Sequence, residues 1–99
     1  MENSRVYVLN QGGHDVSKAR KYGQLISVTK GKVNVFATDR LMQEMRDKLK
    51  DFNSECDYLL ICGSIVLSAL TVKVLYEKFE NFNILIYNCK SLEYIVRRI

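Results

Sequence analysis

The sequence contains no tryptophan and no proline, and only five of its 99 residues are glycine. This composition excludes collagen-like, linker-like and low-complexity chains. Hydrophobic residues make up 47% of the chain and charged residues 26%, which excludes a disordered chain because there is enough apolar surface to bury. A chain of this length suits one globular domain and is too short for two. We therefore expect a single domain over residues 1–99.

Cysteine and histidine are also scarce. The three cysteines, Cys56, Cys62 and Cys89, form no C-x-x-C pair, and the single histidine, His14, cannot supply an ordinary zinc site. The odd number of cysteines favours a reducing, cytoplasmic location. We interpret Cys62 and Cys89, at predicted strand ends, as small core residues. Neither a metal site nor a cofactor is predicted.

The chain lacks the patterns of secretion and membrane insertion. Residues 1–5 lead directly into a strand-like run, without the order of basic, apolar and small residues that marks a signal peptide. The longest uncharged run, residues 58–72, is interrupted by Gly63 and Ser64 and is shorter than the roughly 20 apolar residues that span a bilayer. No membrane partner is expected.

The formal net charge is +4, and the excess lies in the first half of the chain. Residues 1–50 hold ten basic and five acidic side chains, whereas residues 51–99 hold five and six. Any anion-binding surface is therefore expected in the first half. One basic group there comprises Lys18, Arg20, Lys21, Lys30 and Lys32. We interpret it as a solvated helix face, because no helix-turn-helix, RNP-type or zinc-finger pattern favours nucleic acid.

Short β-branched runs alternate with helical patterns along the chain. Strands are predicted at residues 6–9, 25–28, 58–62, 84–87 and 92–96. Helices are predicted from an Asp15 N-cap to a stop at Gly23, from a Thr38 or Asp39 cap through Phe52, and from Ser64 to about Glu80. Residues 33–36 suit either a hairpin strand or a loop, and we favour the loop. This order predicts a small Rossmann-like three-layer α/β domain with a mostly parallel sheet and an antiparallel C-terminal edge strand.

The first half of the third predicted helix is apolar almost all round, from Ile65 through Val72. A helix of this kind needs cover on more than one side. The sheet supplies one side, and a second protomer is the economical candidate for the other. We therefore expect a homodimer or higher homo-oligomer.

Ligands of open α/β sheets bind beyond the carboxyl ends of the strands, where loops meet helix N-termini. The residues predicted there suit a phosphate- or ribose-bearing ligand such as a nucleotide. They are Asn10, Gln11, Gly12, Gly13, His14, Asp15, Lys30, Arg40, Gly63 and Ser64. Gly12 and Gly13 form neither a G-x-G-x-x-G nor a Walker pattern. Each feature also has a purely structural interpretation: a tight turn at the glycines, a helix cap at Asp15 and a sharp strand-to-helix turn at Gly63 and Ser64.

His14 beside Asp15 suggests acid–base chemistry. Neighbours in sequence rarely orient each other as a catalytic pair does, and no serine or cysteine is placed as a nucleophile by spacing. We therefore assign no catalytic residue and expect His14 to form a hydrogen bond with the ligand or to cover the helix start.

Much of the chain resembles a family of small proteins of unassigned function from tailed bacteriophages and prophages. The segments that carry the resemblance are Val6-Tyr7-Val8-Leu9-Asn10, Gly13-His14-Asp15, Tyr22-Gly23, Thr29-Lys30-Gly31, Asn34-x-Phe36-Ala37-Thr38, Asp57-Tyr58-Leu59-Leu60, Gly63-Ser64 and Asn83-Ile84-Leu85-Ile86. The resemblance implies a cytoplasmic protein of an infected bacterium. Three functions follow as hypotheses: a non-enzymatic binder of a nucleotide-like ligand, a module that binds a host protein, and a small hydrolase or nuclease that uses His14 and Asp15.

Overall fold

The computed structural model describes residues 3–10, 15–29 and 31–99, and within them the chain forms five strands and three helical segments. The strands are β1 (Arg5–Asn10), β2 (Gln24–Thr29), β3 (Tyr58–Leu60), β4 (Asn83–Asn88) and β5 (Glu93–Arg98). A 3-10 helix, η1 (Ser17–Tyr22), connects β1 to β2. The α-helices are α1 (Thr38–Lys48), before β3, and α2 (Ile65–Tyr76), after it. Every predicted element has a counterpart, although several ends differ.

The five strands form one sheet in the order β2-β1-β3-β4-β5. β1 pairs in parallel with both β2 and β3, β3 pairs in parallel with β4, and β5 runs antiparallel to β4. The predicted α/β class with an antiparallel C-terminal strand is confirmed. Because the chain leaves β1 toward β2 and later returns to the other side of β1 as β3, the carboxyl ends of β1 and β3 form the topological switch point.

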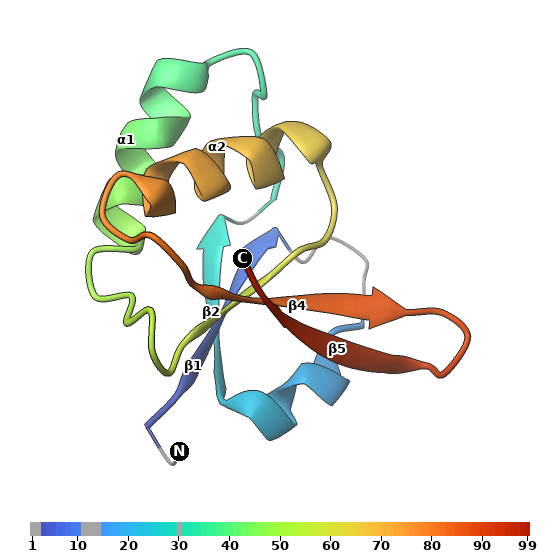
Figure 1. The fold of residues 1–99 in the computed structure, drawn as a ribbon. Coiled ribbons are helices and arrows are strands. Elements are labelled where there is room, and N and C mark those ends of the chain that lie inside the picture. The colour runs from blue at the N-terminus through green and yellow to red at the C-terminus, as the bar shows by residue number, and fades with distance from the viewer. Residues whose placement is uncertain (1–2, 11–14, 30) are drawn as a thin grey trace.

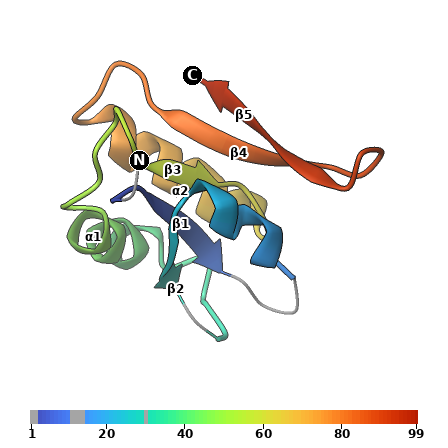
Figure 2. The same cartoon turned by 90° about the horizontal axis from the view of Figure 1, so that it is seen from below.

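Helical segments lie on both faces of the sheet, which gives three layers. In Figure 1, α1 and α2 lie above the strands and η1 lies below them. Figure 2, seen from below, shows η1 across the middle of the sheet, with the β4–β5 hairpin extending past it. A 3-10 helix of six residues is too short to cover a five-stranded sheet, so the described residues form an incomplete lower layer.

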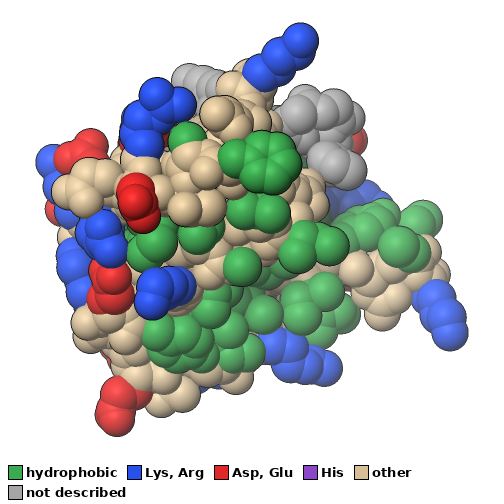
Figure 3. Space-filling view, turned by 90° about the horizontal axis from the view of Figure 1, so that it is seen from above, with side chains coloured by type: hydrophobic (Ala, Val, Ile, Leu, Met, Phe, Trp, Pro, Cys, Tyr) green, Lys and Arg blue, Asp and Glu red, His purple; other side chains and the backbone are tan. Residues whose placement is uncertain are grey.

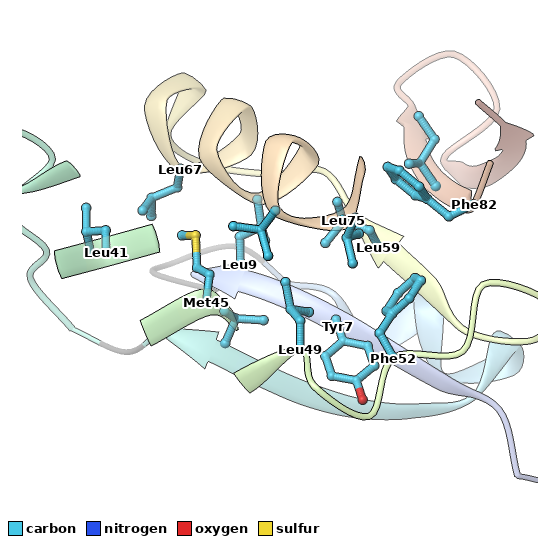
Figure 4. Packing of buried hydrophobic residues seen from close by; sticks show 13 residues of the cluster. Tyr7, Leu9, Leu41, Met45, Leu49, Phe52, Leu59, Leu67, Leu75 and Phe82 are labelled. Carbon is cyan, nitrogen blue, oxygen red and sulfur yellow. The ribbon is translucent and has the colours of Figure 1, made fainter. Parts of the chain in front are cut away.

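The larger core lies between the sheet and the two α-helices (Figure 4). The four residues of the predicted apolar stripe are all buried there, Leu41 and Met45 on α1 and Leu49 and Phe52 in the turn that follows it. The smaller core lies on the η1 side and comprises Val6, Val8, Val16, Ala19, Leu60, Leu85 and Tyr94. β1 contributes to both cores, as its continuous apolar sequence predicts for a central parallel strand.

The segment before η1 departs from the predicted capping. Val16 occupies the N-cap position, and the Asp15 carboxylate accepts a hydrogen bond from the Ser17 N–H at 3.0 Å. Asp15 was predicted to be the N-cap itself, but it lies one residue before the N-cap. Its side chain still accepts a hydrogen bond from a backbone N–H at the helix start. The predicted stop at Gly23 is confirmed, since the Gly23 N–H donates to the Arg20 carbonyl at 3.1 Å and ends the helix.

The prediction that Thr38 or Asp39 caps α1 is wrong. Ala37 occupies the N-cap position, and no side chain caps the helix. Asn34 instead stabilises the turn that leads into α1. Its side-chain oxygen accepts a hydrogen bond from the Phe36 N–H at 3.1 Å, and its backbone carbonyl accepts one from the Ala37 N–H at 3.1 Å. Residues 33–36 form the loop that we favoured.

Four other ends differ from the predictions. α1 ends at Lys48 rather than at Phe52, and the chain turns after it. α2 ends at Tyr76 rather than near Glu80, because the chain tightens into a turn in which the Lys78 N–H donates to the Leu75 carbonyl three residues back. β3 ends at Leu60 rather than at residue 62. Leu92 lies in the hairpin turn with φ of 60°, where its N–H donates to the Asn88 carbonyl at 2.8 Å.

Neither α-helix in the described ranges has the length and apolar content needed to cross a bilayer.

Candidate functional site

Two of the predicted site residues meet at the switch point. Asn10 ends β1, and Gly63 follows β3 with φ of 73°, a left-handed conformation that favours glycine. A Cβ atom at Gly63 would lie 3.4 Å from the Asn10 carbonyl oxygen. The Cys62 thiol lies 3.8 Å from the same oxygen. The glycine therefore allows the chain to leave β3 close against the end of β1.

Ser64 serves as the N-cap of α2. Its hydroxyl oxygen accepts a hydrogen bond from the Leu67 N–H at 3.3 Å, and its carbonyl accepts from the Ser68 N–H at 3.1 Å. Ser64 therefore starts α2 directly after Gly63, in agreement with the structural interpretation of these two residues as a sharp turn from strand to helix. Capping uses an acceptor of Ser64, so the hydroxyl hydrogen is still available as a donor.

Asp15 lies beside Gly63 in a cavity of about 480 Å³, which we call the switch-point cavity. The cavity lies at the carboxyl ends of β3 and β4. Its lining residues are Asp15, Ile61, Cys62, Gly63, Tyr87, Cys89 and Tyr94. Hydrogen bonds from the backbone and the side chain of Ser17 lower the pKa of Asp15, with a smaller contribution from the charge of Lys18. Asp15 is thus ionised at neutral pH and is the charged group among the described lining residues.

Arg40 lies in a different cavity, of about 350 Å³, which we call the basic cavity. The end of β2, the loop after it and one face of α1 form its walls. The lining residues are Ser27, Val28, Thr29, Lys32, Val33, Asn34, Arg40, Leu41, Glu44 and Lys48. Because β2 is an edge strand, this cavity opens at the side of the sheet away from β4 and β5.

The charges of the basic cavity are unbalanced. Lys32, Arg40 and Lys48 contribute three positive charges, and Glu44 is the one described carboxylate in the lining. None of the three cations forms an ion pair within residues 3–10, 15–29 and 31–99, where the ion-paired cations are Arg5, Lys21, Arg46, Lys50 and Arg98. Like charges gathered in one concavity attract a counter-anion.

The predicted site thus divides into two parts. Asn10, Asp15, Gly63 and Ser64 gather around the switch point, whereas Arg40 lines the basic cavity. The Asn10 side-chain amide donates to the Gly31 carbonyl at 2.9 Å, which ties the end of β1 to the loop of the basic cavity. The other predicted residues, Gln11, Gly12, Gly13, His14 and Lys30, lie outside the described residues.

The predicted basic group also divides. Lys18 donates to the Leu92 carbonyl at 2.8 Å and Lys21 lies 3.5 Å from Glu93, so these two η1 side chains reach the β4–β5 hairpin. Lys32 instead lines the basic cavity. The basic residues that lie close together in the sequence are therefore on different parts of the surface.

Several lining residues were not singled out from the sequence. Lys48 could have been found from its spacing, because Arg40, Glu44 and Lys48 recur every four residues on one face of α1. Tyr87 and Tyr94 face each other across the β4–β5 pair, which depends on a hairpin register that the sequence left open.

The cysteines differ from the prediction in part. Cys89 is exposed in the hairpin turn, so its interpretation as a core residue is wrong, while Cys62 is half-buried. Burial raises the pKa of the Cys62 thiol. Within the described parts of the chain, no three His, Cys, Asp or Glu side chains lie together as metal ligands would.

Comparison with curated proteins and with solved structures gives no match. The family profile described as "Phage Pam3 gp32-like protein" matches residues 4–99. This match spans nearly the whole chain and agrees with the phage resemblance of its sequence segments. The chain therefore belongs to the Phage Pam3 gp32-like protein family.

Proposed function

We propose that the protein binds a small phosphate-bearing ligand, such as a nucleotide, in the basic cavity and releases it unchanged, in the cytoplasm of the infected bacterium. The observation that carries the proposal is the set of three cations, Lys32, Arg40 and Lys48, that line one cavity without an ion pair to a described carboxylate. A bound phosphate would supply the missing negative charge.

The chemistry of the lining suits phosphate. The Arg40 guanidinium offers paired N–H donors that match two phosphate oxygens, while Lys32 and Lys48 act as point charges. The side-chain oxygen of Asn34 already accepts a hydrogen bond from the Phe36 N–H. The side-chain NH₂ group of Asn34 is therefore the part that can bond a ligand, as a further donor. Arg40 also lies in the first turn of α1, at the positive end of the helix dipole.

The lining supports binding better than turnover. The Thr29 hydroxyl donates to the Leu9 carbonyl at 2.6 Å, so it is already committed to the fold. Ser27 and Glu44 line the same cavity, and neither forms a hydrogen bond that would activate a nucleophile among the described residues. Charge and hydrogen-bond donors are what the cavity offers.

A thermal-shift screen against mononucleotides, dinucleotides of the NAD class and cyclic oligonucleotides tests the proposal. A ligand present at 100 times its dissociation constant stabilises the folded state by about 2.7 kcal/mol. For a domain of this size that corresponds to a rise in melting temperature of roughly 10 °C or more. Chromatography of the ligand after incubation should recover it intact, and conversion to a product would indicate a hydrolase instead.

A matched pair of variants locates the site. Lys32→Gln/Arg40→Gln/Lys48→Gln should abolish the shift, because it removes the three cavity cations. Arg20→Gln/Lys73→Gln/Lys78→Gln removes the same charge from exposed positions outside the cavity and should keep it. Equal loss of binding in both variants would contradict the assignment to the basic cavity, as would a panel without any stabilising ligand.

A second candidate function, protein interaction, is favoured by the outer face of α2. Ile65 is 85% exposed there, and Val66 and Tyr76 are also exposed. Figure 3 shows hydrophobic side chains gathered on the face of the molecule that carries the α-helices, with charged side chains around them. Contiguous apolar surface of this kind marks interaction sites. We propose that a second copy of the chain covers this face.

Sedimentation velocity distinguishes this candidate. The protein should sediment as a dimer, and Ile65→Lys should yield a folded monomer because a charge replaces the most exposed apolar side chain of α2. Leu92→Lys is the matched control, since Leu92 is exposed in the turn of the β4–β5 hairpin, away from α2 (Figure 1). A wild-type protein that is monomeric at all concentrations would exclude self-association.

A further inference from the structure

The switch-point cavity has a chemical character different from that of the basic cavity. Its walls are mainly apolar and aromatic, with Ile61, Tyr87 and Tyr94 beside the two thiols of Cys62 and Cys89. Its volume of about 480 Å³ lies within the range of small-molecule sites, which are typically apolar with a few polar groups. The phosphate proposal makes no use of these residues.

The incomplete lower layer explains why this cavity exists. Asp15 enters the cavity from the segment before η1, and Tyr87, Cys89 and Tyr94 enter it from the β4–β5 hairpin. η1 is tied to that hairpin through the Tyr22 hydroxyl, which donates to the Tyr94 carbonyl at 3.1 Å. Among the described residues, the short η1 does not fill the space between these two segments. This space lies beside the switch point, where open α/β sheets bind their ligands.

Two tyrosines form an aromatic wall. The rings of Tyr87 and Tyr94 meet edge to face with centroids 5.2 Å apart. Tyr94 is buried, and burial raises the pKa of its phenol, so it stays neutral at physiological pH. Tyr87 is 41% exposed, which leaves part of its ring surface for a second aromatic group.

The charge of the cavity selects against anions. No cation of the described residues lines it, and the ionised Asp15 carboxylate is its charged group. The Ser17 N–H donates to one carboxylate oxygen of Asp15 at 3.0 Å, and the Ser17 side chain also forms a hydrogen bond with the carboxylate. A carboxylate has about four lone-pair sites, so it can still accept from a ligand. A phosphate in this cavity would be repelled by the negative charge of Asp15, whereas an N–H group of a ligand could donate a hydrogen bond to the carboxylate.

We propose that the switch-point cavity binds a planar nitrogen heterocycle of the nucleobase class, with its ring against Tyr87 and an exocyclic amino group donating to Asp15. This site is distinct from the phosphate site of the basic cavity. The two sites take chemically different groups, so each can be tested without the other.

Titrations followed by amide chemical shifts separate the two sites. Adenosine, which has an amino-bearing ring and no phosphate, should shift the amide signals of Gly63, Tyr87 and Cys89. Pyrophosphate should instead shift those of Lys32 and Arg40. If adenosine at millimolar concentration leaves the first set unmoved, the present proposal fails, whatever pyrophosphate does. If pyrophosphate leaves the second set unmoved, only the phosphate proposal fails.

Paired ligands and variants test the two contacts. Purine riboside, which lacks the exocyclic amino group, should bind roughly tenfold to a hundredfold more weakly than adenosine, as the loss of one charge-assisted hydrogen bond implies. Asp15→Asn should abolish this difference by replacing an accepting oxygen with a donor. An unchanged preference for adenosine in Asp15→Asn would overturn the assigned contact.

Variants of Tyr87 test the ring contact in the same titration. Tyr87→Ala should weaken adenosine binding, whereas Tyr87→Phe keeps the ring and should restore it. Tyr76→Ala removes a comparably exposed tyrosine from α2 and should leave binding intact. Equal binding by Tyr87→Ala and Tyr76→Ala, with well-dispersed amide spectra for both, would exclude the aromatic wall as the ring site.

Discussion

Arg5 and Asp57 join the starts of β1 and β3 through both backbone and side chain. The Arg5 N–H donates to Oδ1 of Asp57 at 2.9 Å, and the Arg5 guanidinium lies 3.7 Å from Oδ2. Oδ2 also accepts from the Asn53 N–H at 2.8 Å. Asp57 is only 1% exposed, so this one carboxylate satisfies two backbone donors at the end of the sheet opposite the switch point.

Replacing Asp57 by asparagine is expected to destabilise the protein by about 2 kcal/mol. An amide has one accepting oxygen, so one of the two backbone N–H groups would lose its partner in a buried position. The melting temperature should fall by roughly 10 °C. Asp51→Asn alters an exposed carboxylate nearby and should leave the melting temperature almost unchanged. Equal melting temperatures for the two variants would show that Asp57 does not have this role.

Gly23 is expected to tolerate no side chain. A Cβ atom there would overlap the Ser4 carbonyl oxygen and lie 3.0 Å from the Arg5 nitrogen. Because these are backbone atoms at the start of β1, they cannot rotate away. Gly23→Ala should therefore cost about 1–3 kcal/mol, the usual penalty for overpacking, when measured by urea unfolding. Gln24→Ala, at the exposed next residue, is the control, and a similar small effect of both changes would contradict the clash.

The sheet and the stripe of α1 could be predicted because their signals are local. The apolar run of β1 and the four-residue spacing of Leu41, Met45 and Leu49 each fix an element without knowledge of its neighbours. The 3-10 geometry of η1 could not be read in this way. Asp15 and Gly23 mark its ends equally well for an α-helix, and the choice depends on how β1 and β2 are joined.

The grouping of the site residues depended on tertiary structure. Asn10 and Gly63 could be placed together because the ends of parallel strands meet at one edge of the sheet. Arg40 could not be separated from them, because its position depends on which side of the edge strand β2 the helix α1 packs. The pairing of Tyr87 with Tyr94 could not be predicted without the register of the β4–β5 hairpin. That register depends on Leu92, which lies in the turn and not in the strand as predicted.

The Arg46–Glu77 pair is expected to make stability depend on acid pH. The guanidinium of Arg46 donates to both carboxylate oxygens of Glu77, at 2.9 and 2.8 Å, and this hydrogen bonding lowers the pKa of Glu77 from its usual 4.5. A lowered pKa in the folded state means that the pair stabilises the protein above about pH 4.5 and that this contribution is lost as the pH falls further.

The variant Glu77→Gln isolates this effect. The difference in melting temperature between the wild type and Glu77→Gln should be constant near neutral pH and should shrink on acidification below about pH 4.5. Both side chains are solvent-accessible, so the difference will be small and should decrease with added salt. A difference that grows on acidification would contradict the assigned sign.

Cys89 is expected to be the fastest of the three thiols to react with iodoacetamide. It is exposed in the hairpin turn, whereas Cys56 and Cys62 are half-buried. Burial is the main cause that raises the pKa of both Cys56 and Cys62, with the nearby charge of Asp57 adding to it at Cys56. Because the thiolate is the reactive form, and burial both disfavours it and limits access of the reagent, labelling of Cys89 should precede labelling of Cys56 and Cys62.

Mass spectrometry of peptides from a labelling time course measures this order. Cys89→Ser should remove the fast phase, and Cys62→Ser should keep it. Raising the pH should accelerate the slow phase, because a larger fraction of the Cys62 thiol becomes ionised as the pH approaches its raised pKa. A fast phase that persists in Cys89→Ser would place the reactive thiol elsewhere and would contradict the burial of Cys62 beneath the carbonyl of Asn10.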